Sequence, residues 1–134
     1  MGAQLNDIGL LILRVGAGGL MLICHGWTKF MHYFDTQYNL ASFPDPIGLG
    51  GAMSHHLATF AEFGCSILVI LGVLTRISSL PLTFTMAVAA FVVKSGDPIS
   101  ERELPLLFFA LFLSLICTGG GKYASLKSKT LVLS

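Results

Sequence analysis

The chain has 134 residues, of which 54% are hydrophobic and only 11% are charged, and its formal net charge is +1. Soluble domains carry about 25% charged residues, and a soluble bundle of this length would have too few polar side chains to cover its surface. A net charge this close to zero also gives no basic surface for nucleic acid. The composition therefore excludes a soluble domain and a nucleic-acid-binding protein, and a mean hydropathy of +0.78 predicts a chain whose solvent is lipid.

Four apolar segments follow one another, at residues 8–24, 57–74, 77–93 and 104–118. The first three are close to the roughly 17 residues that a membrane-spanning helix needs, and the fourth is slightly shorter. Extension into the flanks gives predicted spans at about 8–30, 54–74, 77–94 and 103–118. We predict one domain over residues 1–134, an all-α integral membrane four-helix bundle with antiparallel spans. The alternative for the first segment is a signal peptide, but it lacks a positive n-region and an A-x-A-like cleavage site.

The first span carries a basic stripe. At about 100° per residue, its members lie within about 60° of one another on a helix; they are Arg14, Gly18, His25, Lys29 and His32. Glycines in mid-membrane let another helix approach closely, or else expose bare backbone to a ligand. Close helix packing is the favoured interpretation of Gly16, Gly18 and Gly19.

The connection at residues 33–51 is the only long one, and its prolines and glycines exclude a further span. Its aromatic residues predict that it lies on the membrane surface, where it either folds over the mouth of the bundle or serves as a tether; they are Phe34, Tyr38 and Phe43.

The second span contains one ionisable residue in its apolar core, Glu62, on the same helical face as His55, Thr59 and Ser66. A charge at mid-bilayer costs several kcal/mol unless it is paired. We therefore expect Arg14 to reach Glu62 from one side, and His25 and Lys29 from the other. This grouping is interpreted either as an ion pair that locks two helices together or, preferentially, as a polar cavity.

The cavity is expected to take a carbonyl-bearing or acidic ligand, since His25 and Lys29 donate hydrogen bonds and Glu62 accepts them. Candidate cavity residues are Arg14, His25, Lys29, Glu62, His55 and Ser66, with Lys94 and Glu103 at the outer rim. No metal site is expected, because adjacent His55 and His56 diverge by about 100° on a helix. The sequence also lacks a Walker loop, GxGxxG, CxxC and CxxCH, so it contains no nucleotide or covalent haem motif and no catalytic motif.

Three cysteines are present, Cys24, Cys65 and Cys117. Alternating spans place them at different depths, and a disulfide needs Cα atoms within about 7 Å. We expect no internal disulfide and expect all three to be buried as small apolar residues.

The distribution of Lys and Arg predicts the orientation in the membrane. The side with both termini carries Arg76, Lys122, Lys127 and Lys129, whereas the other side carries Lys29, Lys94 and Arg102. Both termini are therefore predicted to be cytoplasmic.

The sequence resembles the DoxX family of small bacterial membrane proteins over nearly its whole length. The resemblance lies in the order and spacing of short motifs, which are Leu13-Arg14-Val15-Gly16, His25-Gly26 with Lys29-Phe30, Phe43-Pro44-Asp45-Pro46, Ala61-Glu62-Phe63-Gly64, Leu71-Gly72 with Thr75-Arg76, Glu103, and Gly119-Gly120-Gly121-Lys122-Tyr123-Ala124-Ser125-Leu126. Lys127 stands where the family usually has Asp. The resemblance implies four membrane helices, the bacterial inner membrane and a link to redox processes, since relatives are named for a thiosulfate:quinone oxidoreductase subunit or tied to oxidative stress.

Three functions follow from the residues and the resemblance together. The favoured one is a component of a membrane redox system that binds a quinone-like or other amphiphilic small molecule beside Glu62, with the lipid bilayer and a redox subunit as partners. The second is a proton-coupled carrier of a small solute that uses Glu62 and His25 and forms a homo-oligomer. The third is a structural scaffold subunit whose polar residues only fix the register of the helices.

Overall fold

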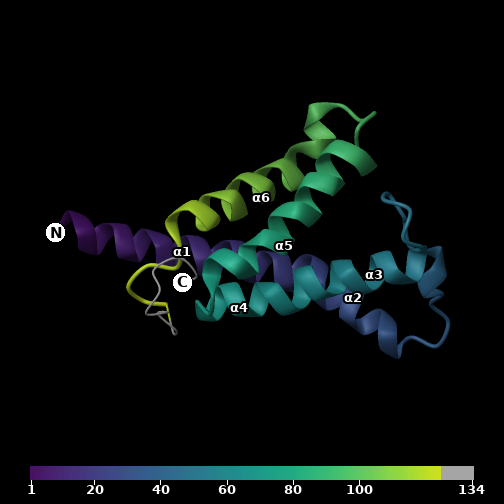
Figure 1. Cartoon of the computed structure of the whole chain (residues 1–134), viewed down its shortest axis with the longest axis horizontal. Helices are drawn as coiled ribbons and strands as arrows, with labels where there is room; N and C mark the ends of the chain where they lie inside the picture. Colours follow the sequence, from purple (N-terminus) through teal and green to yellow (C-terminus); the bar gives the residue numbers. More distant parts are fainter. Residues whose placement is uncertain (125–134) are drawn as a thin grey trace.

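In the computed structural model residues 1–124 are described, and every regular element within them is a helix (Figure 1). The first helix is continuous over Gly2–Phe34 and consists of α1 (Gly2–Met21), η1 (Leu22–Gly26), α2 (Trp27–Met31) and η2 (His32–Phe34). The second consists of α3 (Gly51–Thr59), η4 (Phe60–Cys65) and α4 (Ser66–Leu71). The third and fourth are α5 (Thr75–Val88) with η5 (Ala89–Val93), and α6 (Ile99–Thr118). Ser125, Leu126, Lys127 and Lys129 lie outside the described residues.

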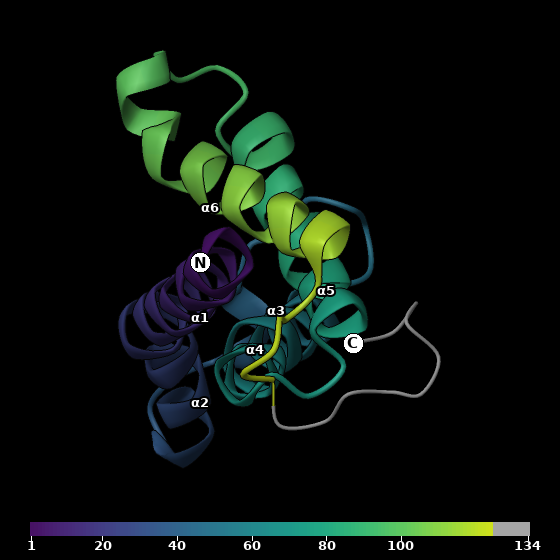
Figure 2. The same ribbon diagram turned by 90° about the vertical axis from the view of Figure 1, so that its left-hand side faces the viewer.

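The helices form two antiparallel pairs. In Figure 1, the first helix lies along the second, with α1 beside α4 and α2 beside α3, while α5 and α6 run side by side and diverge from the first pair toward one end. We call this the loop end, because it carries residues 35–50 and 94–98; the tail end carries Met1, the 72–74 turn and residues 119–124. Viewed from the tail end, the α5–α6 pair lies over α1 and α4 (Figure 2). The predicted all-α fold class is confirmed.

Length and apolarity make three of these helices able to span a membrane, Gly2–Phe34, Gly51–Leu71 and Thr75–Val93. The fourth, α6, is also 20 residues long, but it carries Glu101, Arg102 and Glu103 in its first two turns. Large apolar side chains on every helix point outward, including Ile12, Leu71, Phe91 and Leu107, each more than half exposed. In water such a surface would aggregate. In a bilayer it is the lipid-facing surface of an integral membrane protein.

A tight turn joins α4 to α5 at the tail end. Gly72 ends α4 in the left-handed conformation, with φ +76°, and Leu74 follows with φ +47°. A side chain at Gly72 would also collide with the guanidinium of Arg14, so both the backbone and the neighbouring side chain require glycine. Because α5 begins at Thr75, Pro81 lies inside this helix.

The centre of the bundle is packed by buried side chains from all four helices, among them Met21, Cys65, Leu82 and Phe112. Of the three glycines expected at a helix contact, only Gly18 has a close neighbour, at Ser66 and Ile70, whereas Gly16 and Gly19 have open space beside them. The expectation for Gly16 and Gly19 was therefore wrong, because they lie on the outward side of α1.

Candidate functional site

Lys29 and Glu62 form an ion pair between the first two helices, with Lys29 Nζ 2.5 Å from a carboxylate oxygen of Glu62. It is the only ion pair within residues 1–124. The Glu62 side chain is 6% exposed and that of Lys29 18%. Two opposite charges at this depth are stabilised by each other, since either alone is costly in the membrane. The structure thus contains the predicted contact between Lys29 and Glu62.

Three π-helical segments surround this pair. His25 lies in η1, Glu62 in η4, and η5 contributes Ala89 and Val93. Gly26 of η1 lies so close to the backbone of Glu62 that a Cβ there would collide with its carbonyl oxygen. A π-helical turn inserts one extra residue and is frequent at functional sites. The local widening and the glycine together bring the two helices close enough for Lys29 to reach Glu62.

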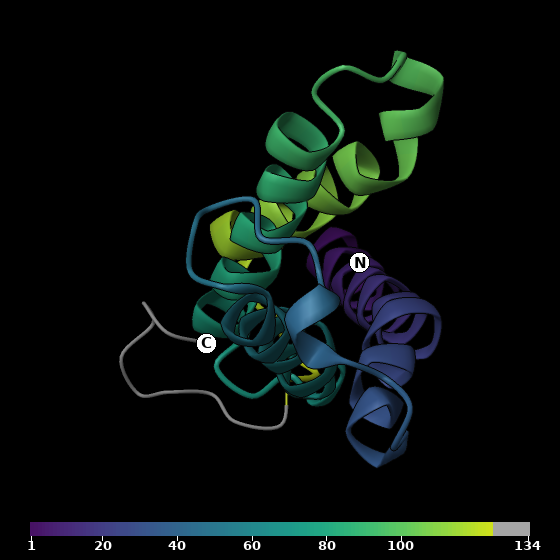
Figure 3. The same cartoon turned by 90° about the vertical axis from the view of Figure 1, so that its right-hand side faces the viewer.

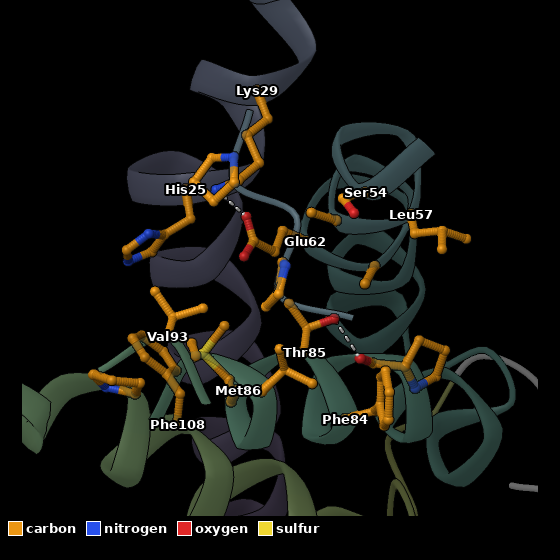
Figure 4. A pocket seen from close by; sticks show the side chains of 18 of the residues that line it. His25, Lys29, Ser54, Leu57, Glu62, Phe84, Thr85, Met86, Val93 and Phe108 are labelled. Carbon is orange, nitrogen blue, oxygen red and sulfur yellow. Dashed lines mark hydrogen bonds and ion pairs between the residues drawn. The ribbon is translucent and has the colours of Figure 1, made fainter. Parts of the chain in front are cut away.

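A cavity of about 670 Å³ lies between the two helix pairs, on the loop-end side of the core (Figure 4). Its walls are almost wholly apolar and include Leu57, Phe60, Phe84, Val88, Leu104 and Phe108. His25, Lys29 and Glu62 line one side together, and the ring of His25 meets that of Phe108 edge-on at 6.1 Å. This volume lies within the range of about 300–1,000 Å³ that small-molecule sites occupy.

The connection between α2 and α3 covers part of this cavity. It crosses the loop end toward α5 (Figure 3), and Phe43, Pro44, Pro46 and Ile47 line the cavity. Asp45 fixes this segment, because its carboxylate accepts hydrogen bonds from the N–H groups of Leu49 and Gly50, both at 2.8 Å, and from Ser54 Oγ at 3.0 Å. The bond from Gly50 is the main reason why the pKa of Asp45 lies below its ordinary value.

Arg14 is not part of this cavity, which corrects its expected pairing with Glu62. The side chain is 1% exposed, and its guanidinium donates to the carbonyl oxygens of Val69, Ile70 and Tyr123 at 3.4, 3.1 and 3.0 Å. Val69 and Ile70 lie in the last turn of α4, whose carbonyls have no partner within the helix. Arg14 therefore caps α4 at the tail end and ties residue 123 to it.

His55 and Ser66 are fully buried on the expected helical face, but neither lines the cavity. Instead, Nε2 of His55 lies 3.1 Å from Nδ1 of His32, within hydrogen-bond distance. The sequence did not predict that these two histidines would be in contact. The hydroxyl of Tyr33 lies 2.6 Å from Nδ1 of His56, also within hydrogen-bond distance. The basic stripe indicated His32, but nothing in the sequence located its partner.

The predicted rim is only half present. Lys94 lines the cavity and donates to the carbonyl of Glu101 at 3.0 Å, whereas Glu103 is exposed and lies outside it. Because α6 begins at Ile99, Glu101 rather than Glu103 falls on the face that turns toward the cavity.

All three cysteines are free thiols, but only Cys65 is buried; Cys24 and Cys117 are exposed on the outer surface, contrary to expectation. Both lie on outward faces of their helices, which lipid rather than protein covers. Within the part of the chain that the structure describes, no group of three or more His, Cys, Asp or Glu side chains is arranged to hold a metal ion.

Fold and site together define a small integral membrane protein, a helical bundle with a largely apolar intramembrane cavity and one charged pair in its wall. Comparison with known proteins gives the family: the DoxX family matches residues 9–95, and the chain belongs to it. The predicted family resemblance is thereby confirmed.

Two relatives extend this comparison. The chain is 29% identical over 127 residues to the inner membrane protein YqjF of Escherichia coli, covering 90% of this chain and 92% of that protein. It is 38% identical over 85 residues to an uncharacterized protein of Haemophilus influenzae, covering 60% of this chain and 56% of that protein, so the match spans little more than half of that relative. No solved structure matches the chain.

Proposed function

We propose that this protein binds an amphiphilic small molecule with a quinone-like head group in the cavity beside Glu62, as a component of a membrane redox system. One observation carries the proposal: the walls of the cavity are mostly apolar, while Lys29, Glu62 and His25 are gathered on one side of it and Lys94 and Glu101 lie at its rim. An amphiphile with one polar end and an apolar body has this same asymmetry.

The residues present fit a flat head group that bears carbonyl oxygens. Lys29 has three N–H donors, of which the contact with Glu62 uses one, and the imidazole of His25 supplies another. Phe108 and Phe84 offer ring surfaces to a planar group. A bound quinone would supply transfer of two electrons with two protons; the residues of this chain would orient its carbonyl oxygen, hold or release a proton at Glu62, and exclude water with the 43–47 segment.

The ion pair also predicts the charge of the ligand. Because Glu62 already neutralises Lys29, an anionic ligand would have to compete with the carboxylate for the ammonium group. A neutral carbonyl or hydroxyl group can accept from Lys29 without displacing it. We therefore favour a neutral head group over a fatty acid.

The proposed location is the bacterial inner membrane with both termini in the cytoplasm. The name of the Escherichia coli relative supports the membrane. The ion pair of Lys29 supports the orientation, because it leaves Lys94 and Arg102 as the basic residues at the loop end. Arg76 and Lys122 lie at the tail end, and Lys127 and Lys129 follow Lys122 in the sequence.

The test is a titration of the purified protein in lipid nanodiscs with decylubiquinone, followed by tryptophan fluorescence and by the melting temperature. We expect saturable binding that raises the melting temperature. Lys29→Met should weaken binding about tenfold or more, since a hydrogen bond from a charged group contributes about 1.5–3 kcal/mol and tenfold corresponds to about 1.4 kcal/mol.

The matched control is Glu103→Gln, a carboxylate on the same membrane side that lies outside the cavity, and it should bind like the wild type. The proposal would be contradicted if the wild type neither bound decylubiquinone nor showed a higher melting temperature with it. It would also be contradicted if Glu103→Gln weakened binding as much as Lys29→Met does.

A further inference from the structure

A cluster of imidazole and phenol rings lies at the loop end of α3, outside the cavity. His55, which is fully buried, is at its centre. His32 approaches it from the end of the first helix, with 3.1 Å between Nδ1 and Nε2, and stacks on Tyr38 at 3.7 Å between ring centroids. Phe43 meets His55 edge-on at 5.1 Å. The two imidazoles share one hydrogen bond, in which either ring can be the donor.

This bond continues into the membrane along α3. The other ring nitrogen of His55, Nδ1, lies 3.4 Å from Oγ1 of Thr59, which is also buried. Glu62 follows three residues later, about 4.5 Å farther along the axis. In this structure the hydroxyl of Thr59 donates to the carbonyl oxygen of His55 at 2.8 Å, and the carboxylate of Glu62 pairs with Lys29. Residues three apart on a helix are neighbours, so a turn of the Thr59 hydroxyl would direct it toward Glu62. The polar groups His32, His55, Thr59 and Glu62 therefore follow one another from the loop end to the buried carboxylate.

A purely structural role does not account for this row. His32 is half-buried, whereas His55, Thr59 and Glu62 are all buried, so the row leads from an accessible residue into the interior of the bundle. Apolar residues would hold these helices together without the cost of burying imidazoles and a hydroxyl. Groups that both donate and accept, placed in succession from a surface to an ionisable residue, are what proton transfer within a membrane requires.

We propose that His32, His55 and Thr59 form a proton relay that connects the loop-end surface with Glu62. A proton that arrives at Nε2 of His32 releases the Nδ1 proton to Nε2 of His55. Thr59 turns its hydroxyl away from the carbonyl of His55 and gives its own proton to the carboxylate of Glu62, while Thr59 Oγ1 takes the Nδ1 proton of His55. Once Glu62 has released its proton into the cavity, turns of both rings and of the Thr59 hydroxyl restore the starting state, and no oxidant or reductant is consumed.

The relay deepens the proposed function, because a carbonyl group reduced beside Glu62 must take up protons; the proton path itself needs no ligand. Other titratable groups face its two ends. His55 also has Tyr33, Tyr38 and His56 around it, and Glu62 has Lys29 and His25. Tyr33 and His56 bond to each other and are exposed, so they lie beside the row and not within it.

The test measures how fast Glu62 is protonated after an acid pH jump, in the ligand-free protein in nanodiscs, by time-resolved infrared absorption of its carboxyl group. Glu62→Gln identifies the band. We expect His55→Phe, which keeps a ring in the cluster, to slow protonation by about 100-fold without changing its final extent, as for loss of a positioned proton donor. His56→Phe, at the next position of the same helix, should leave the rate unchanged.

A second variant separates transfer from packing. His32→Ala opens a space at the half-exposed end of the row, and added imidazole should restore most of the lost rate. Equal rates in the wild type and His55→Phe, failure of imidazole to restore His32→Ala, or a Glu62 that never takes up a proton would each overturn the relay. The decylubiquinone titration is independent of these measurements: lost binding with an intact relay rejects only the proposed function, and the converse rejects only the relay.

Discussion

The two ends of the bundle each bury a basic side chain, and they neutralise it differently. At the tail end, Arg14 is enclosed by carbonyl oxygens of α4 and of residue 123, and it lies outside the cavity. At the loop end, Lys29 faces the carboxylate of Glu62 in the wall of a cavity. Carbonyl oxygens of the backbone can neither move far nor take up a proton. A carboxylate can do both, so only the loop end has groups that can respond to a ligand.

The strongest way to break this comparison is Arg14→Met. The carbonyls of Ile70 and Tyr123 would lose their donor from Arg14, while the carbonyl of Val69 would keep its bond from the N–H of Gly72; each unsatisfied group costs about 1–3 kcal/mol. We expect the free energy of unfolding to fall by about 3 kcal/mol, measured by denaturant titration in mixed micelles. The folded fraction should still bind decylubiquinone with wild-type affinity. A stable Arg14→Met protein that had lost binding would show that Arg14 serves the ligand after all.

The incorrect prediction that Arg14 pairs with Glu62 has a simple geometric cause. Helical periodicity placed Arg14 and Lys29 on one stripe, which gives an angle around the axis but ignores depth. The two residues are 15 positions apart, about 22 Å along a helix. Arg14 is consequently level with Val69 and Ile70, while Lys29 is level with Glu62.

What could be predicted were the features set by composition and by the cost of buried charge. An all-α membrane bundle and a charged partner for Glu62 follow from these alone. The His32–His55 contact was beyond reach, because it depends on how far the first helix extends past the membrane and how the two helices cross. The π-helical turns at His25 and Glu62 likewise have no recognisable sequence pattern, although they shift the faces that helical periodicity assigns.

An intermediate effect is expected from a close backbone contact that exists only at the loop end. Gly26→Ala would force its Cβ against the carbonyl of Glu62 and push η1 away from η4. Overpacking of this kind costs about 1–3 kcal/mol, and here it also separates Lys29 from Glu62. We expect lower stability together with weaker decylubiquinone binding.

Gly16→Ala is the matched control, since Gly16 is on the same helix with open space beside it. It should leave binding unchanged and slightly raise stability, because alanine favours helix by about 1 kcal/mol over glycine. Equal behaviour of the two variants would mean that the close approach at Gly26 does not position the ion pair.

The smallest effect concerns the segment over the cavity, and it depends on pH. Asp45 accepts hydrogen bonds from Gly50, Leu49 and Ser54, and the first of these is the main cause of its lowered pKa. A carboxylate whose pKa is depressed by folding stabilises the folded state above its ordinary pKa of 3.8, and this contribution is lost as the pH falls through the lower folded-state value. The tether of the 43–47 segment is therefore complete at neutral pH and weakens only in acid.

Asp45→Asn removes the charge but nearly keeps the shape, so it isolates this contribution. At neutral pH we expect the variant to melt below the wild type, and we expect the difference to vanish as the pH is lowered past 3.8. If the segment closes the cavity, the variant should also release bound decylubiquinone faster at neutral pH, with little change at the tail end. A difference in melting that persists unchanged in acid would show that the carboxylate does not hold the segment. In that case the loop end would owe its closure to the apolar contacts of Phe43 and Ile47, and the contrast with the rigid tail end would rest on the ion pair alone.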